Sequence, residues 1–162
     1  APVQELAPGP PPPDRGRSGE ASEERSTIFE RIKDMTVVEK QRLARSASKT
    51  ERTILVRDPL KQVHLFVLKN PRVRQDEVLE YAKYGGLAPQ ALKYIADNKT
   101  WMQSHQLRLN LVKNPNIPME SARLIMGQLQ HMDLRKLMKS GAVRPDIRSL
   151  ARKEAQKKGL IS

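Results

Sequence analysis

The stretch Val67-Leu68-Lys69-Asn70-Pro71 decides the fold, because it returns 44 residues later as Leu111-Val112-Lys113-Asn114-Pro115. Internal repetition with a period of about 40–47 residues is typical of proteins built from stacked short helices. In both copies an apolar segment precedes Asn-Pro. Proline cannot continue a helix and asparagine tolerates the left-handed conformation, so each copy predicts a buried helix that ends in a left-handed asparagine cap.

The residues around the two copies match as well. Each Asn-Pro is followed by apolar residues at helical spacing, and two further apolar patterns end at Asn98 and at Ser140, an offset of 42 residues. A shortened earlier member of the series ends at Asp58-Pro59. The alternative is chance recurrence of an ordinary loop tripeptide, but chance does not explain why the flanking apolar positions match.

Short helices with short joints are predicted from residue 27 onward. Asp58-Pro59 is predicted to be an N-cap followed by proline at the first helical position, and Gly85-Gly86 to be a helix-ending turn. The spacings of Thr36 with Glu39 and of Ser48 with Glu51 predict capping boxes. The predicted helices cover residues 36–44, 48–55, 58–70, 78–84, 89–95, 101–112, 118–129, 133–138 and 145–158.

These segments resemble an uncharacterised bacterial family of α-helical repeat proteins, similar to HEAT/armadillo-like or leucine-rich-repeat-variant arrays. The resemblance covers about residues 27–158 and rests on MTVVEKQRLA (35–44), ILVRDPLKQV (54–63), VLKNPRV (67–73), EVLEYAKYGGLAPQALKYIADNKTW (77–101) and LRLNLVKNPNIP (107–118). It implies an all-α fold: a short right-handed superhelical stack of helix pairs, with about three repeats plus flanking helices. Such arrays bind partners, commonly proteins and sometimes nucleic acids, on an extended curved surface.

Composition divides the 162 residues into one domain and two tails. Residues 1–26 are rich in Pro, Gly and Ser and predict a disordered tail or linker, with a polyproline ligand as the alternative. Residues 27–158 form the predicted repeat domain, and 159–162 a short C-terminal tail. The chain has no cysteine, which excludes disulfides and thiolate chemistry and agrees with a cytoplasmic location. No apolar run is long enough to span a membrane.

The charge is strongly basic and concentrated near the C-terminus. The chain has a net charge of +12, and residues 134–162 hold nine Lys and Arg against two Asp and Glu. Arg144, Arg148 and Arg152 recur at intervals of four, so a helix would place them on one face. The predicted binding face for an anion or a partner consists of Arg144, Arg148, Arg152, Lys153, Arg135 and Lys139. A solubilising cap at the end of the array would explain the same charges.

A second possible binding face contains Trp101, His105 and Arg108, which would share one stripe of a continuous helix. The alternative is that Trp101 fills a seam between repeats. Arg57 and Lys61 belong to the same candidate face, because cations gather near the joints and equivalent joints of a stack would lie on one edge. Those joint cations are Arg57, Lys61, Arg72, Arg74, Lys99, Lys113 and Arg123.

No catalytic, metal or cofactor site is predicted. His64, His105 and His131 lie far apart without the spacing of metal ligands. The chain has neither a glycine-rich phosphate loop nor a Gly-x-Ser-x-Gly elbow. The sequence therefore predicts a protein that is not an enzyme and needs no cofactor.

Three functions remain open at this point. The favoured one is a helical-repeat adaptor whose basic surface docks an acidic protein partner. The second is a nucleic-acid-binding module with little sequence preference, whose binding would weaken steeply with salt. The third is a receptor for an anionic nucleotide second messenger, held by Arg144 and Arg148 or by Arg42 and Arg45. The sequence does not determine the oligomeric state.

Overall fold

The computed structural model describes residues 15–162, and the described chain is helical with no strand, which confirms the all-α prediction. The chain divides into two compact units, residues 1–34 and residues 35–162. The first unit contains one helix, α1 (Arg15–Lys33). All other helices belong to the second unit.

Helix α1 differs from the disordered segment predicted for residues 1–26. Residues 15–26 are helical, whereas residues 1–14 lie outside the described part. Local interactions support this helix: the hydroxyls of Ser22, Ser26 and Thr27 donate to backbone carbonyls one turn earlier. Lys33 and Glu30 add an ion pair of 2.7 Å at i, i+3. The Pro, Gly and Ser content gave no sign of these contacts.

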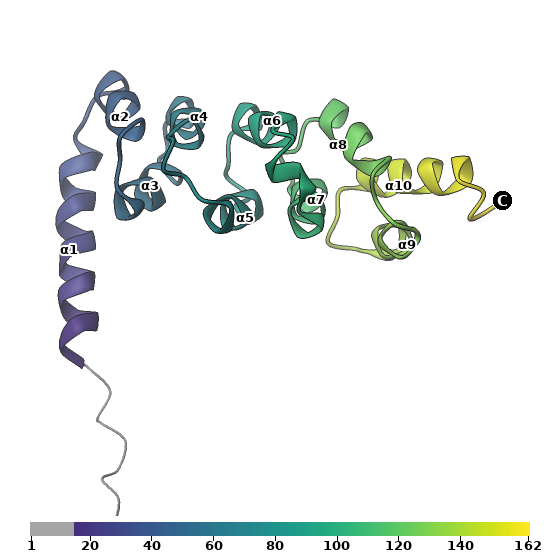
Figure 1. Ribbon diagram of the computed structural model, residues 1–162, viewed down its shortest axis with the longest axis horizontal. Coiled ribbons are helices and arrows are strands. Elements are labelled where there is room, and N and C mark those ends of the chain that lie inside the picture. Colours follow the sequence, from purple (N-terminus) through teal and green to yellow (C-terminus); the bar gives the residue numbers. More distant parts are fainter. Residues whose placement is uncertain (1–14) are drawn as a thin grey trace, which may run out of the picture. The chain divides into compact units, whose positions relative to one another are not determined.

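The second unit contains nine short α-helices, and eight of them, α2 to α9, form two rows (Figure 1). One row contains α2 (Val37–Ala44), α4 (His64–Leu68), α6 (Pro89–Asp97) and α8 (Met119–Met126). The other contains α3 (Lys49–Leu55), α5 (Gln75–Lys83), α7 (His105–Lys113) and α9 (His131–Lys139). Helix α10 (Pro145–Lys157) packs on α8 and α9, and two 3₁₀ turns, η1 (Lys61–Val63) and η2 (Trp101–Gln103), precede α4 and α7.

The predicted start and stop signals are mostly confirmed. Thr36 with Glu39 and Ser48 with Glu51 form reciprocal capping boxes. Proline opens α6 and α10, where its missing N–H costs nothing. At the end of α10, Gly159 has a φ of +73°, and the Leu160 N–H bonds the Ala155 carbonyl. This is a Schellman cap, which requires the left-handed conformation that glycine adopts freely.

The left-handed asparagine caps predicted at Asn70 and Asn114 are wrong. No non-glycine residue in the described chain has a positive φ, and Asn114 is extended, with φ −72° and ψ 129°. The following proline disfavours helical backbone at the preceding residue, which explains the extended conformation. The asparagines act through their side chains instead. The Asn114 Oδ1 accepts the Asn116 N–H at 2.9 Å, and its Nδ2 donates to the carbonyls of Ala82 and Tyr84 at 2.7 and 2.9 Å.

The same contact recurs three times at 44-residue intervals, at Asn70, Asn114 and Lys158. Asn70 Nδ2 donates to the carbonyls of Ala44 and Ala47 at 2.9 and 3.1 Å. Lys158 Nζ donates to the carbonyls of Gly127 and Leu129 at 3.2 and 3.0 Å. Each of these staple residues follows one helix (α4, α7 or α10) and bonds carbonyls at or just past the end of an earlier helix (α2, α5 or α8).

The predicted N-cap at Asp58 is also corrected. The helical segment begins later, at Lys61, with Leu60 as its cap. Asp58 Oδ1 accepts the Leu60 N–H at 2.9 Å, two residues on, and Oδ2 accepts from the buried ammonium of Lys40 at 2.7 Å. The tertiary ion pair with Lys40 therefore holds the carboxylate in a turn before the helix.

His64 links this joint to the next one. Its Nδ1 accepts the Ala88 N–H at 3.1 Å, so its Nε2 carries the proton and donates to the Asp58 carbonyl at 2.7 Å. Burial lowers the pKa of His64 below its ordinary value of 6.5. The folded protein holds His64 neutral, since a proton on Nδ1 would remove the acceptor for Ala88.

We expect the free energy of unfolding to fall as the pH drops through the range below 6.5. The unfolded chain binds a proton at His64 with the ordinary pKa, whereas the folded chain resists protonation, so acid favours unfolding by up to about 1.4 kcal/mol per pH unit. His64→Gln should flatten the decline in urea unfolding measured from pH 7 to 5. His131→Gln, which changes an exposed side chain, should keep it. An unchanged decline in His64→Gln would contradict the assignment.

We expect Asn114→Ala to lower the free energy of unfolding by about 1–3 kcal/mol, because two carbonyls lose their donor. Chemical denaturation of the full chain measures the change. Gln90→Ala, on the exposed surface of α6, is the control and should stay within about 0.5 kcal/mol of the parent protein. Equal stability of the two variants would show that the staple residue contributes nothing.

Candidate binding surface

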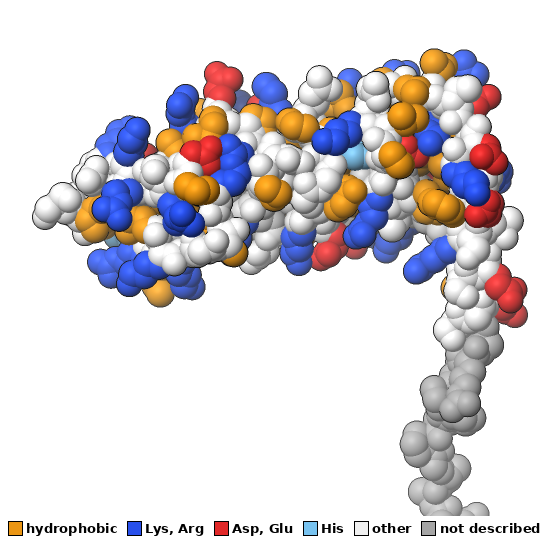
Figure 2. All heavy atoms as spheres, turned by 180° about the vertical axis from the view of Figure 1, so that it is seen from behind, with side chains coloured by type: hydrophobic (Ala, Val, Ile, Leu, Met, Phe, Trp, Pro, Cys, Tyr) orange, Lys and Arg blue, Asp and Glu red, His pale blue; other side chains and the backbone are white. Residues whose placement is uncertain are grey.

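Six exposed cations on two packed helices form the candidate surface, called the basic surface below. Helix α9 contributes Arg135, Lys136 and Lys139, and helix α10 contributes Arg152, Lys153 and Lys157. None of the six has a carboxylate within ion-pair distance among the described residues. In the view of Figure 2, Lys and Arg side chains gather at the left-hand end, around α9 and α10, with apolar side chains between them.

Cations far outnumber acids in residues 35–162, and most of the acids already have a partner. Residues 35–162 contain 25 Lys and Arg and 11 Asp and Glu, a net charge of +14. Nine of those carboxylates are engaged in capping boxes or ion pairs, which include the buried pairs Lys40–Asp58 and Arg52–Glu77. Because each ion pair neutralises one cation for every carboxylate, the net charge of +14 rests on the cations that have no carboxylate partner.

The three arginines that the sequence placed on one face differ in their contacts. Arg144 donates to Asp146 at 3.0 and 2.5 Å and to the carbonyls of Pro115 and Ile117. Its guanidinium lowers the pKa of the Asp146 carboxyl. Arg148 donates to the carbonyls of Ser140 and Val143, both at 3.1 Å. Only Arg152 of the three is exposed and without such contacts in the described chain.

The predicted stripe of Trp101, His105 and Arg108 does not form on one helix. Trp101 lies in η2, Ser104 is extended, and α7 begins at His105. The Trp101 ring packs edge-on against Tyr94, with 6.2 Å between centroids. His105 faces Asp133 at 3.4 Å, and Arg108 donates to the Met102 carbonyl at 2.7 Å. The extended residue that caps α7 breaks the helical phase assumed by the prediction.

The remaining residues of the second predicted face lie on the α3–α4 joint. Lys61 is exposed in η1, and the Arg57 guanidinium lies over the Tyr84 ring, 5.2 Å from its centroid. The other joint cations, Arg72, Arg74, Lys99, Lys113 and Arg123, are all exposed. The joints that carry these cations connect helices of both rows. The cations therefore do not form the single ridge along one row that equivalent joints were expected to give (Figure 1).

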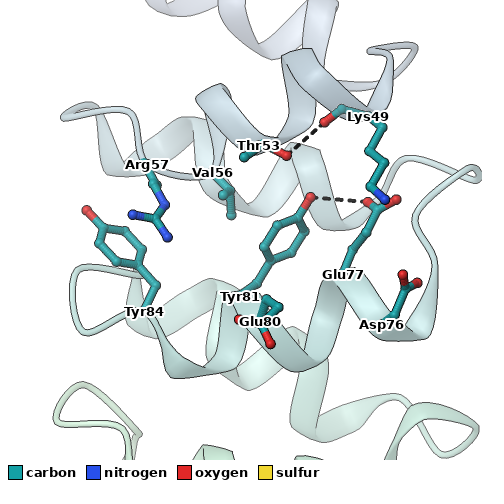
Figure 3. Close-up of a pocket in the computed structure, with 9 residues that line it drawn as sticks. All are labelled: Lys49, Thr53, Val56, Arg57, Asp76, Glu77, Glu80, Tyr81 and Tyr84. Atoms are coloured by element: carbon teal, nitrogen blue, oxygen red, sulfur yellow. Dashed lines mark hydrogen bonds between the residues drawn. The ribbon is translucent and has the colours of Figure 1, made fainter. Parts of the chain in front are cut away.

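A groove between α3 and α5, the first groove, has a volume of about 290 Å³. Figure 3 shows Tyr81 from α5 extending toward Thr53, with the Glu77 carboxylate beside its hydroxyl, and Arg57 beside Tyr84. Glu77 accepts two hydrogen bonds from Arg52, at 2.6 and 2.8 Å, and one from the Tyr81 hydroxyl at 3.2 Å. Burial raises the pKa of Tyr81, which keeps this hydroxyl a donor. The groove is thus lined by polar groups that satisfy one another.

A second groove lies between the end of α6, η2 and α8 and has a volume of about 430 Å³. Its apolar lining includes Ala96, Met102 and Ile125, and its edge includes Leu124, of which 67% is exposed. Lys99 and Arg108 line the same groove. The buried Nε of Arg108 has no hydrogen-bond partner in the described chain. The apolar residues that follow the second Asn-Pro include Leu124, and their helical spacing does not distinguish this exposed leucine from its buried neighbours.

Two kinds of feature are missing from the part of the chain that the structure describes. No group of three or more His, Cys, Asp or Glu side chains could hold a metal ion. No described helix has both the length and the apolarity that crossing a lipid bilayer requires.

No protein-family model, curated protein or solved structure matches the chain. The resemblance to helical-repeat families therefore remains a prediction from the sequence.

We expect Arg148→Ala and Arg152→Ala to differ in stability although both remove an arginine from α10. Arg148→Ala should lower the free energy of unfolding by about 1–3 kcal/mol, because it leaves the carbonyls of Ser140 and Val143 without their donor. Arg152→Ala removes only an exposed charge and should change it by less than about 0.5 kcal/mol. Thermal or urea unfolding compares them; equal losses would contradict the distinction.

Proposed function

We propose that this protein is a non-enzymatic helical-repeat scaffold that docks an acidic protein partner on its basic surface. The observation that carries the proposal is the excess of exposed, unpaired cations on α9 and α10. Electrostatic complementarity of this kind speeds encounter with an acidic partner and fixes its orientation. A cytoplasmic location, expected from the absence of cysteine, belongs to the same proposal.

The repeat architecture is part of the proposal and is supported by the staple residues. Asn70, Asn114 and Lys158 make equivalent contacts at 44-residue spacing. The spacing groups the helices as α2–α4, α5–α7 and α8–α10, which gives three units of three helices in place of the helix pairs expected from the sequence. A right-handed superhelical stack of these units would present α9 and α10 at its last turn.

A protein partner is favoured over nucleic acid by the side chains between the cations. Met132 is 67% exposed on α9 and precedes Arg135 and Lys136 by three and four residues, so the three share a helix face. Sequence-independent binding of single strands instead uses exposed aromatic rings on which bases stack. All aromatic side chains of residues 35–162 are buried or half-buried.

Binding of a defined acidic peptide tests the proposal. The probe is a fluorescein-labelled 20-residue peptide of Glu, Ser and Gly, and a random-sequence DNA strand of equal charge is the comparison. We expect the peptide to bind the full chain at low salt, to bind more tightly than the DNA, and to lose affinity as salt is added. Tighter binding of the DNA would favour a nucleic-acid-binding module, and no peptide binding at low salt would overturn the proposal.

Matched charge variants locate the interaction. We expect substitution of Arg135, Lys139, Arg152 and Lys153 by alanine to weaken peptide binding by roughly tenfold or more, at about 0.2–1 kcal/mol per exposed ion pair. The control removes the same charge elsewhere, by substituting the exposed Arg42, Lys49, Arg72 and Arg74 by alanine. Equal losses in both variants would mean that total charge, and not the basic surface, governs binding.

A further inference from the structure

The two grooves occupy equivalent positions in successive 44-residue units. Adding 44 to Glu77, Glu80, Tyr81 and Tyr84 of the first groove gives Ser121, Leu124, Ile125 and Gln128, all of which line the second. On the facing helix, adding 40 to Val56 and Arg57 gives Ala96 and Asp97, which also line the second groove. The residues of the second groove can therefore be compared, position by position, with those of the first.

The polar groups that occupy the first groove are absent from the second. The buried pair Arg52–Glu77, with side chains 5% exposed, is replaced at the equivalent positions by Leu92 and Ser121. The tyrosine that bonds Glu77 is replaced by Ile125. The volume rises from about 290 to about 430 Å³. The second groove is therefore wider and has an apolar floor.

The edge of the second groove also differs. Leu124 stands where the first groove has Glu80, and its side chain is 67% exposed, among the most exposed large apolar side chains of the described chain. An exposed leucine beside an apolar hollow gains stability only when another apolar group covers it. This arrangement points to an apolar side chain of a partner as the occupant.

The charges around the hollow define the partner's chemistry. Lys99 is exposed and has no ion-pair partner in the described chain. Arg108 uses one guanidinium nitrogen for the Met102 carbonyl and leaves its Nε unbonded. One carboxylate, Asp97, also lines the groove, but it is paired with Lys93 at 2.7 Å. The available charge at the edge is positive.

We propose that the second groove binds an acidic segment of the partner by taking one of its apolar side chains between Leu124, Met102 and Ile125, with a carboxylate beside Lys99 or Arg108. This inference rests on the proposed function, because the basic surface brings the acidic segment to the protein. It adds a short-range site to the long-range attraction.

Two acidic peptides of equal charge test the groove on the full chain. One is the Glu, Ser and Gly peptide described above, and the other has two of its serines replaced by leucine. We expect the leucine peptide to bind roughly tenfold tighter, since burial of one leucine side chain is sufficient for such a gain. Leu124→Asn should reduce the gain below about twofold while leaving affinity for the all-polar peptide unchanged.

Val38→Asn is the matched control, because Val38 is similarly exposed, 62%, and lies on α2, away from both the second groove and the basic surface. It should preserve the gain from leucine. Equal affinity of the two peptides for the parent protein, survival of the gain in Leu124→Asn, or an equal loss in Val38→Asn would each overturn the groove assignment. These outcomes leave binding of the all-polar peptide intact. Loss of that binding alone would overturn the proposed function, and binding of neither peptide would overturn both.

Discussion

The satisfaction of helix-end carbonyls is the constraint on which this structure depends. Each helix leaves its last four carbonyls without an intrahelical partner, and nine short helices in residues 35–162 create many such ends. Asn70, Asn114 and Lys158 supply donors to carbonyls at or just past such ends, from positions 23–32 residues away in sequence. Each staple residue therefore satisfies a helix end and fixes two non-consecutive helices side by side in a single contact.

The same constraint explains the charge of the surface. Arg144 and Arg148 donate hydrogen bonds to carbonyls at the joints, and Lys40 and Arg52 form ion pairs with buried carboxylates. A buried carboxylate without its cation would be strongly destabilising, so these pairs are fixed by the fold. The six cations of the basic surface make no such contact within the described chain and lie on the outside of α9 and α10. The proposed binding function uses these exposed cations, which the fold does not need for its internal contacts.

Local signals in the sequence were sufficient for the helices, but not for the contacts between them. The capping boxes at Thr36 and Ser48 involve residues three apart, so their sequence spacing predicted them. Asp58 was misassigned because its ion-pair partner, Lys40, lies 18 residues away. The backbone of Asn114 was misassigned because Pro115 keeps it extended, and the carbonyls that its side chain binds lie 30 and 32 residues away. The stripe of Trp101, His105 and Arg108 failed because extended Ser104 interrupts the helix. The 44-residue spacing of Asn70 and Asn114 was visible in the sequence, whereas the equivalent contact of Lys158 was not, because lysine is a different residue type.

Repetition of one architecture with different side chains suits the proposed division of labour between the basic surface and the second groove. Exposed charges attract any acidic protein and are weakened by salt, so they contribute more to encounter than to discrimination. An apolar hollow acts only over contact distance and rewards a partner that supplies a fitting side chain at the right place. In the first groove, Arg52, Glu77 and Tyr81 fill the equivalent space, whereas the second groove stays open beside Leu124. Selectivity among acidic partners would then reside in α6 and α8, where the net positive charge is lower than on α9 and α10.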